Sequence, residues 1–367
     1  MMKYICRHCG KTYPITSMRY ICECGSLLHL SYPKTPPDFG SLGNDHSLWR
    51  YRSALPPFER ETIEQITMGE GGTPIIRLEE NLFGKADYLM PTLSFKDRGA
   101  VMLAALMAEA GVKRCAIDSS GNAATAVAAY AARGGITTEV FVPASTSAKK
   151  LTQIEAHGGR IQAIDGSRDE TARATIDYVN ASRIFYASHI FNPFFWEGTK
   201  TYIYELYEQF ETLPEVLIVP VGNGTLLMGV YIALQELKAW NLIDSYPLVI
   251  AFQAANCAPL AQAYEKRSLV PQSVAVSPTL AEGIATGVPA RGKDILQAAH
   301  ELGGRFVTVT EEEIIKAHSD LAKKGVYVEH TSAANYAAYR VAVEKDATLA
   351  DKKALIPLCG AGLKSAH

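Results

Sequence analysis

Apolar and polar positions follow two alternating patterns along most of the chain. Short apolar runs such as 215–221 and 247–254 have the length and the branched side chains of buried strands. The longer stretches between such runs repeat apolar residues every three or four positions, as helices that cover a sheet do. This alternation predicts an α/β architecture with mainly parallel sheets.

The same pattern places the elements along the sequence. We expect strands at 114–119, 138–143, 160–165, 184–188, 215–221, 247–254, 305–310 and 354–359. We expect helices at 123–133, 148–157, 169–181 and 199–210, from 225 onward, and twice between the last two strands. Residues 33–53 are rich in Pro, Gly, Asp and Ser, which predicts a linker. Thr331 or Ser332 is expected to cap the last helix.

Composition and charge narrow the classes of function. The formal net charge is −2, whereas a general nucleic-acid binder or a protein of anionic membranes would carry a basic excess. Apolar stretches such as 101–107 are too short to cross a bilayer, and the first residues lead into cysteines rather than an apolar targeting run. We therefore expect a cytoplasmic protein with no nucleic-acid or membrane partner.

Four of the seven cysteines lie near the amino terminus. They form two close pairs, each followed by a glycine, and are Cys6, Cys9, Cys22 and Cys24. This spacing resembles a zinc ribbon, in which four thiolates surround a structural zinc ion as a tetrahedron. The second pair is one residue tighter than usual, so a metal-free relic of such a ribbon is the alternative. We predict a zinc-ribbon-like segment at residues 1–30.

A lysine at the expected start of a helix carries the strongest chemical signal. Lys96 stands between Phe95 and the pair Asp97-Arg98, ahead of a long Ala, Leu and Met run. The N–H groups and partial positive charge at a helix N-terminus disfavour an ammonium group. A neutral amine there can attack an aldehyde, as a Schiff-base lysine does. An ordinary solvated lysine is the alternative, and the motifs downstream argue against it.

Glycine-containing loops follow three of the expected strands, at 119–122, 221–225 and 359–362. In parallel sheets, ligands bind in the loops beyond the carboxyl ends of the strands. The loop at 221–225 suits an anion, because its glycines allow close approach and the following helix aims N–H groups at a phosphate. Together with a Schiff-base lysine, this loop predicts a phosphorylated aldehyde, pyridoxal 5'-phosphate.

These motifs resemble the fold-type II (tryptophan synthase β-like) pyridoxal-phosphate enzymes, and among them the threonine synthase family. The resemblance runs from 68–74 to 360–364 and is most specific around Lys96 and at 119–122. It implies two doubly wound parallel-sheet domains besides the amino-terminal segment. The large cofactor-binding domain would comprise 31–95 and 190–367, and the small mobile substrate domain 96–189. Such enzymes are commonly dimers, so a homodimer is implied.

The resemblance also assigns roles around the cofactor. Lys96, with Phe95 beside it, would form the Schiff base and then move the α-proton of the substrate. Asn122 would hydrogen-bond the cofactor's phenolic oxygen, and Cys359 stands where the family places a residue facing the pyridine nitrogen. The cofactor's phosphate would be held by Gly222, Asn223, Gly224 and Thr225. A neutral thiol does not enforce a protonated ring, which favours elimination and replacement over transamination. A buried structural thiol is the alternative for Cys359.

The part that would contact the substrate departs from the family pattern. The substrate carboxylate would be received by Ser119, Ser120 and Gly121. Beyond them, Ala123 stands where the family has a threonine, His189 where it has an asparagine and Phe195 where it has an arginine. In the family, these three polar side chains would recognise the phosphate of O-phosphohomoserine. Leu93 replaces a glycine before the lysine. Phenylalanine cannot replace the arginine fork, so a less charged substrate is implied, unless a protonated His189 binds the anion.

The predicted function is that of a threonine synthase-like enzyme acting by elimination or replacement on a small-molecule substrate, an amino acid with a β or γ leaving group. We expect it not to be optimised for O-phosphohomoserine. A serine/threonine dehydratase-type ammonia-lyase is the main alternative. An alternative of another class is a non-catalytic zinc-ribbon interaction protein on a retired scaffold.

Overall fold

The computed structural model describes residues 2–275 and 277–364, which form two compact units. Among these residues, the first unit contains 2–70 and 96–198, and the second contains 71–95 and 199–364. This division differs from the predicted domains, because 31–70 and 190–198 group with the cysteine segment and 96–189 and not with the large domain.

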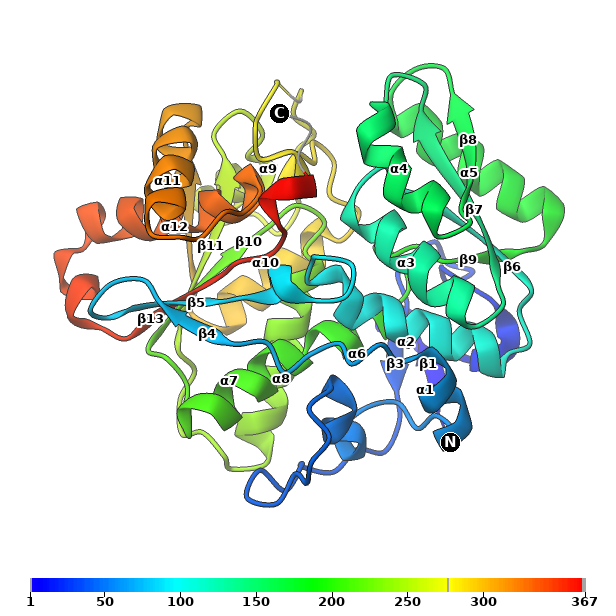
Figure 1. Ribbon diagram of the computed structural model, residues 1–367, viewed down its shortest axis with the longest axis horizontal. Coiled ribbons are helices and arrows are strands. Elements are labelled where there is room, and N and C mark those ends of the chain that lie inside the picture. The colour runs from blue at the N-terminus through cyan, green and yellow to red at the C-terminus, as the bar shows by residue number, and fades with distance from the viewer. Residues whose placement is uncertain (1, 276, 365–367) are drawn as a thin grey trace. The chain divides into compact units, whose positions relative to one another are not determined.

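The first unit contains a four-stranded parallel sheet in the order β8-β7-β6-β9. Its strands are β6 (Arg114–Asp118), β7 (Thr137–Pro143), β8 (Arg160–Ile164) and β9 (Phe185–Tyr186). Its helices are α1 (Arg60–Ile66), α2 (Lys96–Glu109), α3 (Asn122–Arg133), α4 (Ala148–Ala156), α5 (Arg168–Ser182) and α6 (Phe194–Thr199). Because crossovers between parallel strands are right-handed, α3 and α4 cover one face and α5 the other, as Figure 1 shows.

A small antiparallel sheet in the same unit carries the amino-terminal cysteines. In it, β1 (Lys3–Ile5) pairs with β2 (Thr12–Pro14) on one side and with β3 (His29–Ser31) on the other. Each of these strands has only three residues. The first cysteine pair follows β1 and the second precedes β3, so the sheet brings the two pairs together.

The predicted linker at 33–53 is wrong in its last part. Residues Leu48–Ala54 form a 3-10 helix in which Leu48, Trp49 and Tyr51 are buried. The turn-forming composition of the earlier residues dominated the prediction. Burial of two aromatic side chains and a leucine stabilises an ordered segment by several kcal/mol, roughly 2 per side chain, which outweighs that composition.

The second unit contains a six-stranded sheet in which only β4 runs antiparallel to its neighbour. In spatial order the strands are β12 (Arg305–Val309), β11 (Leu248–Ala254), β10 (Val216–Pro220), β13 (Ala354–Pro357), β5 (Leu82–Lys85) and β4 (Ile75–Arg77). The helices are α7 (Thr201–Phe210), α8 (Thr225–Ala239), α9 (Pro259–Glu265), α10 (Gly292–Glu301), α11 (Glu311–Lys323) and α12 (His330–Lys345).

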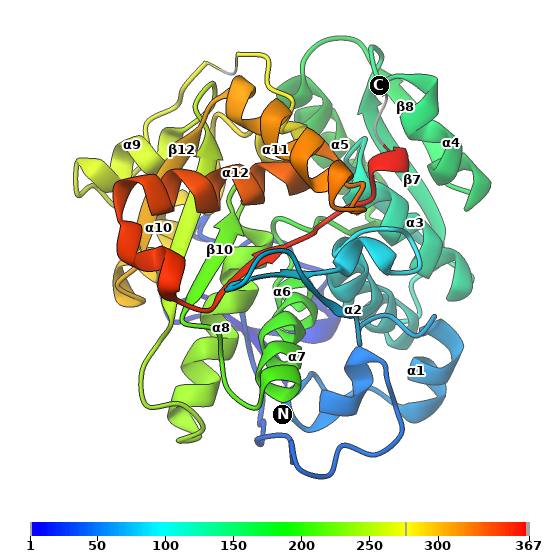
Figure 2. The ribbon, with the colours of Figure 1, turned by 60° about the vertical axis from the view of Figure 1, so that its left-hand side comes forward.

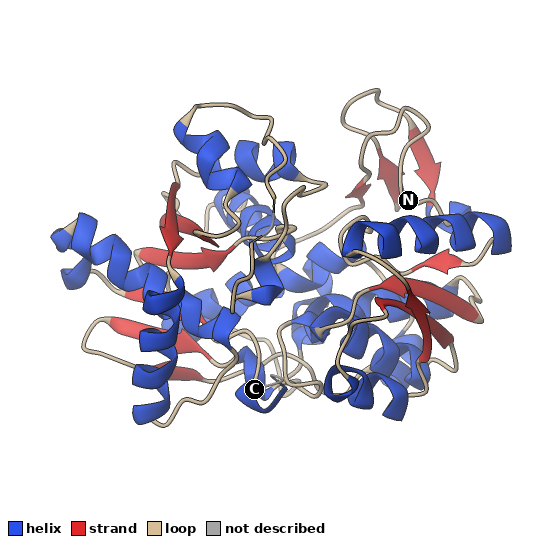
Figure 3. Cartoon of the chain, turned by 90° about the horizontal axis from the view of Figure 1, so that it is seen from above, coloured by secondary structure: helices blue, strands red, loops and turns tan. Residues whose placement is uncertain are grey.

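The path of the chain explains how these helices cover the sheet. The chain passes from β10 through β11 to β12 and then returns to β13, so right-handed connections place α8 on one face and α11 and α12 on the other. Figure 2 shows α12 crossing one side of the sheet next to α11. Figure 3 shows helices, in blue, packed beside strands, in red. This doubly wound arrangement confirms the predicted α/β fold class.

The boundaries of the predicted strands and helices differ from the observed ones by at most two residues. The short helices α1, α6 and α9, the helix α10 and the strands β1 to β5 were not predicted. Among the described residues, no helix is long and apolar enough to cross a membrane.

A buried carboxylate joins three parts of the first unit. Glu70 accepts hydrogen bonds from Nε1 of Trp49 at 2.8 Å and from the hydroxyl of Tyr130 on α3 at 3.1 Å. It also accepts from the hydroxyl of Thr67 at 3.0 Å and from the backbone N–H of Met68 at 2.8 Å. Burial raises the pKa of Glu70, against the effect of these hydrogen bonds. The network fixes the 3-10 helix and α3 to the same carboxylate.

We expect Glu70→Gln to lower the free energy of unfolding by roughly 2 kcal/mol, because it leaves a buried donor without an acceptor. Trp49 donates to one oxygen of Glu70 and Met68 donates to the other, so the amide nitrogen of glutamine faces a donor in either orientation. Urea unfolding measures the effect. The control is Glu64→Gln on exposed α1, for which we expect less than about 0.5 kcal/mol. Equal effects of the two substitutions would contradict the role of the network.

Candidate functional site

Lys96 begins α2, as predicted, and its side chain is half-buried. Its Nζ lies 5.8 Å from the centroid of the Phe195 ring. The same ring packs on Gly99, one turn along α2, where an added Cβ would lie 2.3 Å from a ring carbon. Phe195, which stands where the resemblance expects an arginine, therefore lies beside the candidate lysine.

His189 lies next to this aromatic ring, at 5.8 Å between the ring centroids of His189 and Phe195. It is 5% exposed, and its Nδ1 has no hydrogen-bond partner among the described residues. Burial lowers the pKa of His189 well below its usual range, and the charges of Lys96 and Arg168 lower it further. The imidazole is therefore neutral, which argues against the alternative that a protonated His189 binds an anion.

The turn between β6 and α3 contains the residues expected to receive a carboxylate. Ser119 is buried, and its hydroxyl accepts the N–H of Gly121 at 3.4 Å. A Cβ at Gly121 would meet no heavy atom of the described residues within 4 Å, so the turn faces open space. The first-turn N–H groups of α3, which begins at Asn122, lack intrahelical acceptors. The turn, with Ser120 also partly exposed, suits an anionic group.

In the second unit, the loop at 221–224 connects β10 to the 15-residue helix α8. Gly224 has a φ of 75°, in the left-handed region that glycine adopts most readily. A Cβ at Gly222 would lie 2.9 Å from Cα of Ile284, and one at Gly224 would lie 2.5 Å from Ile295. Close packing therefore requires both glycines. The loop leads into a helix N-terminus, as the predicted phosphate site requires.

Cys359 follows β13 and is 2% exposed. Its carbonyl accepts the N–H of Phe95 at 2.8 Å, and Ser94 forms a β-bridge with Gly360. The backbone just before Lys96 is thus fixed to the loop that contains the candidate cofactor thiol. Leu93, where the resemblance expects glycine, has a φ of 63°, which costs a non-glycine residue roughly 1 to 2 kcal/mol.

Two hydroxyls near the start of α12 support these loops, and the sequence-based roles of both were wrong. The Oγ of Ser332 accepts the N–H of Gly360 at 2.8 Å, and the Oγ1 of Thr331 accepts the N–H of Gly283 at 3.1 Å. The N-cap of α12 is Glu329. Neither hydroxyl caps the helix, because each has a partner in another loop. A Thr-Ser pair near the start of a helix predicts a cap from the local pattern alone. No local signal distinguishes a hydroxyl that caps the helix from one that accepts a hydrogen bond from another loop.

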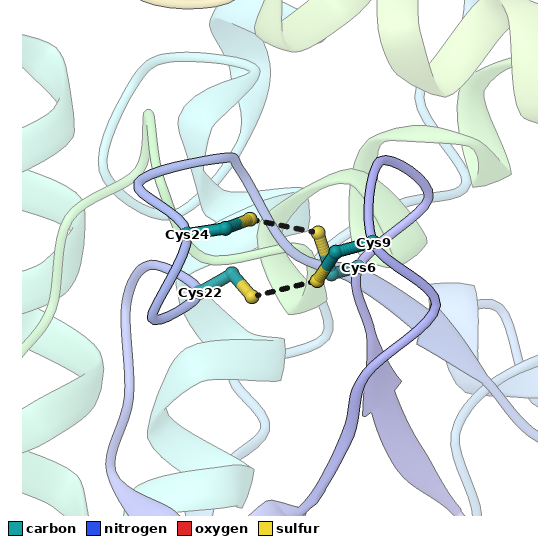
Figure 4. A group of neighbouring side chains, drawn as sticks. All are labelled: Cys6, Cys9, Cys22 and Cys24. Carbon is teal, nitrogen blue, oxygen red and sulfur yellow. Dashed lines mark hydrogen bonds between the residues drawn. The ribbon is translucent and has the colours of Figure 1, made fainter.

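The four amino-terminal cysteines lie close together in the first unit (Figure 4). The sulfur atoms of Cys6 and Cys24 are 3.6 Å apart, and those of Cys9 and Cys22 are 3.5 Å apart. All four sulfur atoms lie within 4.8 Å of one another. Four thiolates bound tetrahedrally to zinc, with Zn–S bonds of about 2.3 Å, are about 3.8 Å apart. The spacing of the sulfur atoms therefore matches a zinc site.

Comparisons with known proteins agree with the family that the sequence motifs indicate. The family model described as "Pyridoxal-phosphate dependent enzyme" matches residues 66–360. The threonine synthase of Methanocaldococcus jannaschii is 32% identical over 383 residues, covering 98% of this chain and 92% of its own length. The threonine synthase of Mycobacterium leprae is 33% identical, covering 89% and 91%.

Solved structures show the same fold. The processed form of threonine deaminase isoform 2 from Solanum lycopersicum has a TM-score of 0.70 at 21% identity, covering 79% of both chains. Maize serine racemase has a TM-score of 0.68 at 20% identity, covering 82% of this chain and 93% of its own. By its family match and its relatives, the chain belongs to the fold-type II pyridoxal-phosphate-dependent enzymes and is a threonine synthase-like member of them.

Proposed function

We propose that this enzyme catalyses elimination or replacement on an amino acid whose β or γ leaving group carries less charge than a phosphate. The observation that carries the proposal is the surroundings of Lys96, where the ring of Phe195 and a neutral His189 lie together. A dianionic phosphate is bound best by arginine forks and other cations. Neither Phe195 nor a neutral imidazole supplies such a charge.

The residues present fit pyridoxal phosphate. Lys96 is a half-buried amine at a helix start, and the tightly packed glycine loop leads into the N-terminus of α8. When bound, the cofactor supplies an aldehyde that captures amines and a ring that withdraws electrons from the substrate's α-carbon. Lys96 would hold the aldehyde, Asn122 the phenolic oxygen and Cys359 the ring nitrogen. The residues that would hold the phosphate are Gly222, Asn223, Gly224 and Thr225.

The residues of the chain have separate roles in the proposed reaction. The turn formed by Ser119, Ser120 and Gly121 holds the substrate carboxylate through hydroxyl and N–H groups. The amine of Lys96 would accept the α-proton of the substrate, and the leaving group would depart with its bonding electrons. Water or another nucleophile takes its place, or hydrolysis yields a keto acid and ammonia. A neutral thiol at Cys359 does not enforce a protonated ring, which favours these outcomes over transamination.

The second candidate is a serine/threonine ammonia-lyase. The hydroxyl leaving group of serine or threonine is uncharged, so the ring of Phe195 and the neutral His189 suit it as well. The lysine at the start of α2, the turn before α3 and the glycine loop before α8 support an enzyme over a non-catalytic scaffold. Assembly as a homodimer and a cytoplasmic location stay predictions.

A structural zinc ion at Cys6, Cys9, Cys22 and Cys24 is the second part of the proposal. The distances between the sulfur atoms support it, as do the thiolate ligands that zinc prefers. Four protein ligands leave no open coordination position, so this zinc would stabilise the fold without touching the substrate.

We expect Lys96→Ala to abolish the visible absorbance of the lysine-bound cofactor and to lower turnover by at least about 100-fold, the usual share of a catalytic proton-transfer group. Absorbance spectra and steady-state kinetics measure both effects. The matched control is Lys113→Ala, which removes an exposed lysine before β6 and should change neither. If Lys96→Ala kept the absorbance band, Lys96 would not be the cofactor lysine.

Substrate choice is tested by restoring the residues of the family pattern. The unaltered enzyme should release keto acid and ammonia from neutral amino acids faster than phosphate from O-phosphohomoserine. The double variant His189→Asn, Phe195→Arg should raise kcat/KM for O-phosphohomoserine at least about 10-fold, the worth of one charge-assisted hydrogen bond. Phe195→Leu, which opens space without adding charge, is the control. Rapid phosphate release by the unaltered enzyme would refute the proposed preference.

The zinc content of the purified protein tests the proposed zinc site directly. Purified protein should contain about one zinc per chain, and Cys9→Ser should lower this content by breaking the set of four ligands. Elemental analysis by mass spectrometry measures the metal. Cys257→Ser, at a buried cysteine outside the cluster, is the control and should retain the metal. Protein purified without chelators that holds no zinc and takes up none on addition would refute the site.

A further inference from the structure

The ribbon, defined as residues 3–32 with strands β1, β2 and β3, packs against the substrate segment, defined as residues 189–197. Three ring contacts join them, with centroid distances between 5.9 and 6.3 Å. The contacting pairs are Tyr4 with Phe194, Tyr20 with Phe191, and His29 with Trp196. All three are edge-to-face contacts, which stabilise aromatic pairs by roughly 0.5 to 1.5 kcal/mol each beyond their burial.

A buried polar contact completes the attachment at the end of the segment. The hydroxyl of Tyr32 lies 2.5 Å from Oε2 of Glu197 and 2.9 Å from the carbonyl oxygen of Ala54. Tyr32 is 8% exposed and Glu197 is 3% exposed. A buried carboxylate that loses its hydroxyl partner keeps the full cost of desolvation. The hydroxyl of Tyr32 is therefore one of the groups that hold Glu197 in position.

The opposite side of the substrate segment packs against α2. The ring of Phe195 lies on Gly99 and near Lys96. At Gly198, an added Cβ would lie 1.8 Å from the carbonyl oxygen of Arg98, so the two backbones are in direct contact. Within the first unit, the segment therefore lies between the ribbon and the first turn of the lysine helix. A shift of the ribbon would remove the support behind Phe195 and His189.

The sheet of the ribbon is small. Its strands have three residues each, and a sheet of this size buries too little apolar surface to be stable alone. In such small metal-bound folds, the free energy of metal binding is the free energy of folding. The cysteine cluster therefore controls whether the ribbon presents an ordered surface to the substrate segment.

We propose that the ribbon is a metal-dependent support that fixes the substrate segment against α2 and thereby sets the position of Phe195 and His189. Tyr32 is a positioning residue that acts through Glu197. The inference rests on the proposed zinc site and on the proposed substrate side at His189 and Phe195. The ribbon then affects the affinity for the substrate, whereas it does not affect the binding of the cofactor to Lys96.

The experiment compares hydrogen–deuterium exchange in the holoenzyme, in enzyme treated with a zinc chelator, and in Tyr32→Phe, which keeps the four cysteines. Exchange should rise in peptides covering 189–197 in both altered proteins. In Tyr32→Phe, KM should rise about 10-fold, the effect of one lost hydrogen bond to a charged group, with kcat within about twofold and cofactor absorbance unchanged. Lys11→Ala, which removes an exposed ion pair with Glu23 on the ribbon, is the control and should change none of these.

Unchanged exchange at 189–197 in both the chelator-treated enzyme and Tyr32→Phe would overturn the inference. Increased exchange with an unchanged KM would also overturn it, because the support would then have no effect on the substrate. An unaltered enzyme that turned over no amino acid would refute the proposed function instead. The exchange measurements would still decide whether the ribbon supports the segment.

Discussion

Backbone hydrogen bonds between the residues before Lys96 and the loop after β13 are the constraint on which the geometry of the candidate site depends. The N–H of Phe95 donates to Cys359, and the N–H of Ala361 donates to Leu93. These bonds fix the backbone that leads into α2 to the loop of the candidate cofactor thiol. Ser332 in turn holds Gly360 through its hydroxyl. The left-handed conformation of Leu93 persists because this pairing determines it.

The surroundings of Lys96 combine a reactive amine with apolar and neutral groups. The ring of Phe195 beside the amine and a buried, uncharged His189 are the basis of the proposal that the substrate brings little charge of its own. Phe194 and Trp196, the residues on either side of Phe195, contact aromatic rings of the ribbon. In the proposed function, one short helix, α6, links the candidate substrate side at Phe195 to the amino-terminal ribbon.

Much of this arrangement could be predicted from local sequence. The start of α2 at Lys96 and the start of α8 at Thr225 were placed correctly, because their turns and periodic apolar faces are local signals. The 3-10 helix at Leu48–Ala54 was missed because its composition is that of a loop, and its order comes from distant partners such as Glu70. Thr331 and Ser332 were misassigned for the same reason.

The sequence by itself determined the α/β class, the candidate lysine, the glycine loop and the four cysteines, since each depends on residues close together in the chain. Only the tertiary structure decided that His189 is neutral, because desolvation depends on everything packed around it. It alone brought Tyr32 to Glu197, 165 residues further along the chain. Periodicity specifies which face of an element is buried, whereas the partner of that face is chosen when distant segments pack together.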